Sequence, residues 1–250
     1  MTGQYNFRNW KAFGLMEPDQ RTFGHTMTEA GYKTVISGKW QFYSYNPPDF
    51  EPEWRSKGQL AEHAGFDEYC LWHVHQTADK GSGYADPVIY QNGKYRTDNQ
   101  GKYGPDLYAE FLMDFMERHR NGPFFAYYPM ALTHGPFNPT PDSPVWKNGN
   151  RLENNPKYFK DMVEYMDKII GRLVKKIDDL GVRENTLILF FSDNGTPQAV
   201  VSYMGQQKIK GGKGLPTDAG TWVPFIASWK GTTPQGKVLD DLVDSTDFVA

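Results

Sequence analysis

The chain has 250 residues, a formal net charge of −3, and 38% hydrophobic and 15% aromatic residues. This length can bury the core of one large domain, and the small net charge gives no general attraction to nucleic acid or to an anionic membrane. The sequence has no apolar run long enough to span a bilayer, and its single cysteine, Cys70, excludes an internal disulfide and a cysteine-based zinc site.

Helical and strand-like patterns alternate in the first half of the chain. A short helix is expected around 22–30, followed by the strand KTVIS at 33–37. The aromatic-rich stretch 42–104 has the character of an insertion that could line a pocket. The apolar residues of 105–120 share one face of a helix, so this segment is predicted to be helical.

The same alternation continues to the C-terminus. The apolar run at 124–130 predicts a buried strand, and 157–180 shows the most regular helical period in the chain, with Gly181 placed as its C-terminal cap. Further strands are expected at 186–192 and 223–229. Helices that alternate with apolar strands predict an α/β fold, a three-layer sandwich around a mostly parallel central sheet.

Polar residues follow three of these strands. Lys39 follows the first, His134 the second, and Asp193 with Asn194 the third. Ligands of such sheets bind beyond the carboxyl ends of the strands. The pattern therefore brings a cation, an imidazole, an acid and an amide to one edge.

Each of these residues also has a purely structural interpretation. Asp193-Asn194-Gly195 is a favourable turn sequence, His134 could be an ordinary loop histidine, and most lysines, such as Lys39, are solvated. The glycines of 210–214 could make a flexible loop, since they do not fit a phosphate-binding P-loop. His73 and His75 could chelate a metal, but a role in a strand or loop is favoured.

Four segments together resemble the sulfatase family of the alkaline phosphatase superfamily. They are TMTEAGYKTVISGKWQ at 26–41, FFAYYPMALTHGPFNP at 124–139, YMDKIIGRLVKKIDDLGVRENTLILFFSDNG at 165–195, and KGGKGLPTDAGTWVPFIASWKG at 210–231. They occur in the family's order and extend over nearly all of the chain. The resemblance implies an alkaline-phosphatase-like fold, with 1–250 forming part of a single catalytic domain.

The resemblance also implies a function and a site. It implies hydrolysis of a small-molecule or carbohydrate sulfate ester, assisted by a divalent cation that is usually Ca²⁺. Asp193 and Asn194 match two of the metal ligands, and Lys39 and Lys213 match lysines that contact the sulfate oxygens. His134 matches a histidine near the ester oxygen, suited to act as general acid or to bind sulfate.

The sequence departs from the family in two respects. Gln41 stands where the family has a histidine, and a glutamine can hydrogen-bond to the sulfate or the nucleophile but cannot titrate. Met1-Thr2-Gly3-Gln4-Tyr5 resembles the tail of the family's formylglycine motif, so the resemblance implies that the nucleophile and the remaining calcium ligands lie upstream of Met1. Cys70 has none of the neighbours that the motif requires and is interpreted as a structural thiol. We therefore expect an internal fragment, incomplete at both ends, with an open sheet edge, weak calcium binding and no turnover by itself.

Two other functions stay open at this point. One is a phosphodiesterase or phosphonate monoester hydrolase of the same superfamily, which uses a similar metal site. The other is a catalytically silent binding or structural remnant, which Gln41 favours. A periplasmic or extracellular location is implied by the resemblance alone, and the substrate and the oligomeric state are left open.

Overall fold

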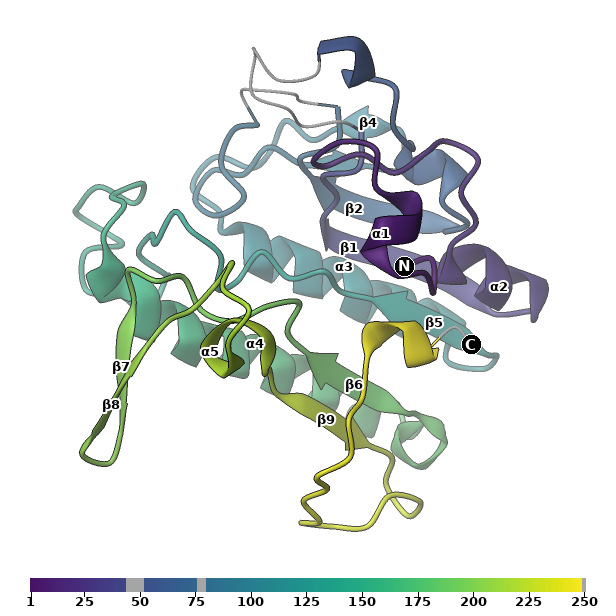
Figure 1. Ribbon diagram of the computed structural model, residues 1–250. Coiled ribbons are helices and arrows are strands. Elements are labelled where there is room, and N and C mark those ends of the chain that lie inside the picture. The colour runs from purple at the N-terminus through teal and green to yellow at the C-terminus, as the bar shows by residue number, and fades with distance from the viewer. Residues whose placement is uncertain (44–51, 76–79, 249–250) are drawn as a thin grey trace.

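A five-stranded mixed sheet forms the centre of the protein (Figure 1). The computed structural model describes residues 1–43, 52–75 and 80–248. The sheet has the order β4-β3-β2-β1-β5, with β1 (Lys33–Lys39) running parallel to β2 (Glu68–Trp72) and to β5 (Phe124–Tyr127). The strands β3 (Tyr90–Gln91) and β4 (Lys94–Tyr95) add an antiparallel hairpin beyond β2.

The predicted helices are confirmed to within two residues at each end. The α-helices are α1 (Asn6–Asn9), α2 (Phe23–Glu29), α3 (Gly104–His119), α4 (Phe159–Asp179) and α5 (Asp218–Thr221). Short 3₁₀ turns lie at Pro52–Trp54, Ala61–His63, Pro156–Tyr158, Arg183–Asn185 and Ser245–Phe248. Within the ranges that the structure describes, no helix is both long and apolar enough to cross a membrane.

Helices pack on both faces of the sheet. Successive residues of β1 point to opposite faces: Val35 joins a cluster with Leu112 and Phe115 of α3, whereas Ile36 joins a cluster against which Phe23 of α2 packs. α4 extends the first cluster through Ile177. The burial of one central strand on both of its faces therefore gives the helix–sheet–helix layering expected from the sequence.

The expectation that the later strands join a mostly parallel sheet is wrong. β6 (Ile188–Phe191) and β9 (Phe225–Ser228) pair antiparallel with each other in a separate two-stranded sheet, and β7 (Val201–Met204) pairs with β8 (Gln207–Lys210) in a hairpin. An apolar run predicts a strand, but it does not specify which neighbour completes the backbone hydrogen bonds. Ile188 still packs on the cluster that lies beneath the central sheet.

The stretch 42–104 contributes to the centre of the fold. Three of the five strands of the central sheet, β2, β3 and β4, lie within it, and β2 is in register with β1 at five positions. This part of the chain is therefore not peripheral to the sheet. Two parts of the predicted insertion, 44–51 and 76–79, lie outside the described residues.

Gly38 lets β1 run unusually close to the segment after β5. Its φ is +133°, and a Cβ atom at this position would lie 2.2 Å from the carbonyl oxygen of Pro129. The next residue, Lys39, donates its backbone N–H to the same oxygen at 2.8 Å. The glycine therefore fixes the place where Lys39 leaves the sheet.

Gly38→Ala is expected to destabilise the protein strongly. A Cβ atom would meet backbone rather than a movable side chain, and the φ value disfavours any L-residue, so the free energy of unfolding should fall by roughly 3 kcal/mol or more. The measurement is denaturant-induced unfolding of the full-length protein. Gly122→Ala is the matched control, because its Cβ would have no atom within 4 Å, and it should change stability by less than about 1 kcal/mol.

Candidate active site

Lys39 places a half-buried ammonium group at the end of β1. Burial lowers its pKa to about 8, and the charges of Lys80 and Lys213 act in the same direction, whereas Asp193 raises it. Lys39 is also the register partner of Trp72 on β2. The structure thus brings two of the predicted lysines and the predicted acid into one electrostatic neighbourhood, together with a third lysine.

His134 belongs to the same neighbourhood. The pKa of His134 lies below its usual value, mainly because the ring is partly desolvated. The charges of Lys39, Lys213 and Lys80 lower it further, and the hydrogen bond to the Gly135 carbonyl raises it. Nδ1 lies 2.6 Å from that carbonyl oxygen. Because a carbonyl can only accept, Nδ1 carries the proton, and Nε2 of the neutral ring is an acceptor.

Glycines lock the Asp193 turn against the Lys213 loop. Gly195 donates its N–H to the carbonyl of Gly220 at 2.9 Å, and a Cβ on Gly195 would lie 2.0 Å from the carbonyl oxygen of Ala219. Lys213 donates its N–H to the carbonyl of Thr196 at 3.0 Å. The segment 210–214 is therefore closely packed, which argues against the interpretation as a merely flexible loop.

Asp193 and Asn194 follow β6 and supply oxygen donors. Burial raises the pKa of Tyr127 to about 12, and the charge of Asp193 acts in the same direction. This effect places the Asp193 carboxylate near the end of β5. Carboxylate and amide oxygens suit a hard cation such as Ca²⁺. Across residues 1–43, 52–75 and 80–248, no three His, Cys, Asp or Glu side chains form a group able to hold a metal. The pair fits part of a calcium site.

Gln41 lies just beyond β1 with a left-handed backbone, φ 61°. Its N–H donates to the carbonyl of His73 at 3.0 Å, so its backbone is tied to the end of β2. His73 itself is buried beside Trp72, at 5.4 Å between ring centroids. His75 lies 3.0 Å from the hydroxyl of Tyr95 and contacts the ring of Tyr90, so it belongs to an aromatic cluster.

Cys70 is fully buried, and burial raises the pKa of its thiol to about 12. A thiol with this pKa stays protonated at neutral pH and is a poor nucleophile. The burial of Cys70 agrees with its interpretation as a structural residue.

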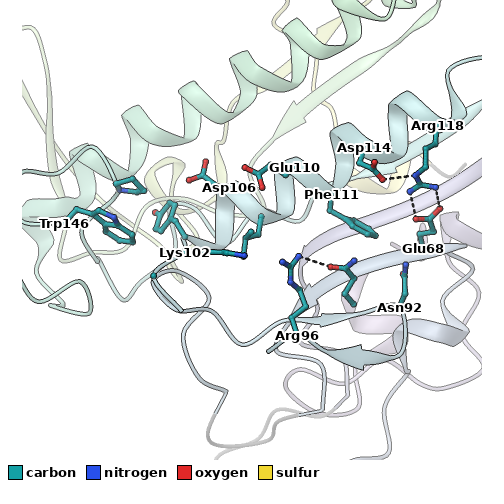
Figure 2. A pocket seen from close by; sticks show the side chains of 15 residues that line it. Glu68, Asn92, Arg96, Lys102, Asp106, Glu110, Phe111, Asp114, Arg118 and Trp146 are labelled. Carbon is teal, nitrogen blue, oxygen red and sulfur yellow. Dashed lines mark hydrogen bonds and ion pairs between the residues drawn. The ribbon is translucent and has the colours of Figure 1, made fainter. Parts of the chain in front are cut away.

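A cavity of about 900 Å³ lies between α3 and the β3–β4 hairpin (Figure 2). Its charges are largely paired: Arg118 binds Glu68 at 2.7 Å and Asp114 at 2.8 Å. The lining residues include none of Lys39, Gln41, His134, Asp193, Asn194 or Lys213. The cavity is therefore separate from the candidate active site.

Comparison with known proteins identifies the family to which the chain belongs. The profile of the Sulfatase family matches residues 1–250. The chain belongs to the sulfatase family. It is 25% identical to an arylsulfatase of Hemicentrotus pulcherrimus over 98% of this chain and 44% of that protein. It is 32% identical to the N-acetylgalactosamine-6-sulfatase of Sus scrofa over 92% of this chain and 43% of that protein.

The sulfatase chain thus spans less than half the length of these relatives. Solved structures support its fold. The crystal structure of Ps i-CgsB in complex with k-i-k-neocarrahexaose matches with a TM-score of 0.74 and 24% identity, over 99% of this chain and 57% of that one. The PsFucS1 sulfatase from Pseudoalteromonas sp. matches with a TM-score of 0.68 and 22% identity, over 98% and 54%.

Lys39→Met is expected to stabilise the protein at pH 7, by about 1 kcal/mol after allowance for solvent screening. Burial penalises the charged form of Lys39. Between pH 8 and about 10.4 the folded wild type has lost this proton while the unfolded chain still binds it, so wild-type stability rises with pH. The advantage of the variant should therefore shrink over this range.

The measurement is unfolding of both full-length proteins at a series of pH values, without sulfate or phosphate in the buffer. Lys57→Met, at an exposed lysine, is the control and should show no such pH dependence. A Lys39→Met protein that is less stable than wild type at pH 7 would contradict the electrostatic account.

Proposed function

We propose that the protein containing this chain hydrolyses sulfate esters in a calcium-dependent reaction. In this proposal Lys39, Lys213 and His134 contact the sulfate ester, and Asp193 and Asn194 bind the cation. The observation that carries the proposal is the mutual electrostatic effect of these cations and the imidazole, in a chain that belongs to the sulfatase family. Such a cluster of positive groups is a site for an anion.

Binding of a sulfate ester relieves the repulsion within the cluster. The ammonium groups of Lys39 and Lys213 lower the pKa of His134 when no anion lies between them. Negatively charged sulfate oxygens offset this repulsion and favour the charged forms of all three side chains. Fixed cations of this kind also stabilise charge that develops when the ester bond breaks.

His134 acts as the proton donor to the leaving group in this proposal. Because Nδ1–H is bound to the Gly135 carbonyl, a proton acquired by the ring goes to Nε2. The anionic substrate raises the pKa of His134 and so favours this protonated form. A proton on Nε2 can be donated to the leaving alcohol oxygen.

A calcium ion held in part by Asp193 and Asn194 would supply fixed positive charge to the anionic groups of the reaction. Asp193 and Asn194 supply two of the six to eight oxygens that it needs. We place the remaining ligands and a formylglycine nucleophile in parts of the protein outside this chain. Gln41 takes no part in proton transfer in this scheme, because its amide does not titrate, but it can hydrogen-bond to the sulfate or the nucleophile.

Carbohydrate sulfates are the proposed substrate class. The similar proteins include an N-acetylgalactosamine-6-sulfatase, and a similar structure was solved with k-i-k-neocarrahexaose. A periplasmic or extracellular location would suit such substrates. The alternative of a phosphodiesterase or phosphonate monoester hydrolase uses the same anion-binding groups, and a silent binding remnant is the alternative that Gln41 favours.

The full-length protein is expected to hydrolyse 4-nitrophenyl sulfate, and His134→Ala and Lys213→Ala should each lower kcat by roughly 10²-fold or more. His63→Ala, at an exposed histidine, is the control and should leave kcat unchanged. Faster turnover of bis(4-nitrophenyl) phosphate or a phenylphosphonate ester would favour the phosphoryl alternative. A double variant that keeps full sulfatase activity would refute this site.

Removal of the proposed metal ligand should weaken calcium binding. Asp193→Ala in the full-length protein is expected to lower the affinity for Ca²⁺ by about tenfold to a hundredfold, because one charged oxygen ligand is lost. Calorimetric titration of the chelator-treated protein measures this directly. Asp240→Ala, at an exposed acid, serves as control, and equal calcium affinities for the two variants would remove Asp193 from the site.

A further inference from the structure

Lys80 is a third lysine of the active site that the sequence did not indicate. Its Nζ lies 5.4 Å from the centroid of the Trp72 ring, and its carbonyl oxygen accepts a hydrogen bond from the indole Nε1–H at 2.9 Å. Both the backbone and the ammonium group of Lys80 are thus positioned by one side chain. Trp72 is only 3% exposed, so it is a fixed support.

This support lies directly beside Lys39. Trp72 and Lys39 are register partners on neighbouring parallel strands, whose separation is about 4.8 Å. Lys80 therefore contacts a ring on β2, the strand next to the one that carries Lys39. Among the charges that affect Lys39, that of Lys80 is the strongest.

The segment after Lys80 is also attached to the His134 loop. A Cβ on Gly83 would lie 2.8 Å from the Trp72 ring, so the segment follows the indole closely. The hydroxyl of Tyr84, which is almost fully buried, lies 2.6 Å from the carbonyl oxygen of Ala131 and 2.5 Å from that of His134. Five consecutive residues thus connect Lys80, the indole and the His134 backbone.

Three lysines exceed what one sulfate ester requires. The ester group carries a single negative charge, and Lys39 and Lys213 are already assigned to it. Lys80 lowers the pKa of both Lys39 and His134, so its presence costs free energy in the empty site. A ligand with a second negative charge would offset this cost.

We propose that Lys80 binds a second anionic group of the substrate, a carboxylate or a further sulfate close to the sulfate ester that is cleaved. This proposal rests on the proposed function and narrows its substrate class to sulfated saccharides with more than one acidic group. The partial burial of Lys80 strengthens an ion pair with such a group relative to one in open solvent.

The test compares Lys80→Gln with wild type in the full-length protein. The substrates are 4-nitrophenyl sulfate, a monosulfated disaccharide with no other charge, a monosulfated disaccharide with a uronate carboxylate, and a disulfated disaccharide. Lys80→Gln should lower kcat/KM by about tenfold to a hundredfold for a doubly charged substrate, mainly through KM. Because Lys80 also lowers the pKa of Lys39 and His134, Lys80→Gln is expected to cause a further change that is common to all four substrates. The effect of about tenfold to a hundredfold is therefore read as the loss in kcat/KM for a doubly charged substrate relative to a singly charged one. The two doubly charged substrates distinguish a carboxylate from a second sulfate.

Two control variants accompany this comparison. Lys80→Arg keeps the charge and should retain most of the wild-type preference, and Lys57→Gln, at an exposed lysine, should change nothing. If Lys80 only packs on Trp72, Lys80→Gln lowers thermal stability and reduces kcat/KM equally for all substrates, which overturns the proposal. If wild type hydrolyses none of the sulfate esters, the proposed function fails and this inference fails with it.

Discussion

A half-buried ammonium group, that of Lys39, lies at the centre of the electrostatic interactions of the candidate site. It is positioned by backbone contacts, since Gly38 allows β1 to approach the Pro129 carbonyl, and it is repelled by Lys80 and Lys213. Desolvated like charges cost free energy unless an opposite charge lies among them. The proposed anionic substrate would supply that opposite charge, and the close backbone packing at Gly38 and in the Lys213 loop holds the groups together without it.

Two parts of the structure meet at this site. The central sheet and its loops supply Lys39, His134 and Lys80, and the unit built on β6 and β9 supplies Asp193 and Lys213. Within the second unit, the backbone contact between Gly195 and Gly220 holds the Asp193 turn against the segment that follows Lys213. Ile188 of this unit packs on the hydrophobic cluster that contains Val35 of β1, so the proposed anion and cation sites depend on the same packing.

Local sequence patterns predict an element correctly where its own residues form one continuous buried face. The helices 105–120 and 157–180 were predicted almost to their ends, because a period of 3.6 residues follows directly from one buried face. The pairing of 186–192 with 223–229 was not predictable in this way. A strand of either sheet shows the same apolar run, and only the tertiary structure decides which strand lies beside it.

For the site, the sequence by itself determined which chemical groups follow the strands: Lys39, His134 and Asp193. Their positions directly after apolar runs can be read along the chain. The tertiary structure alone decided that these groups act on one another, that Nδ1 of His134 carries the proton, and that Lys80 joins them. The physical reason is that these interactions act across space rather than along the chain. Electrostatic and cation–π interactions depend on distance in space. Lys80 lies over Trp72, and no local pattern encodes the place of Trp72 beside β1.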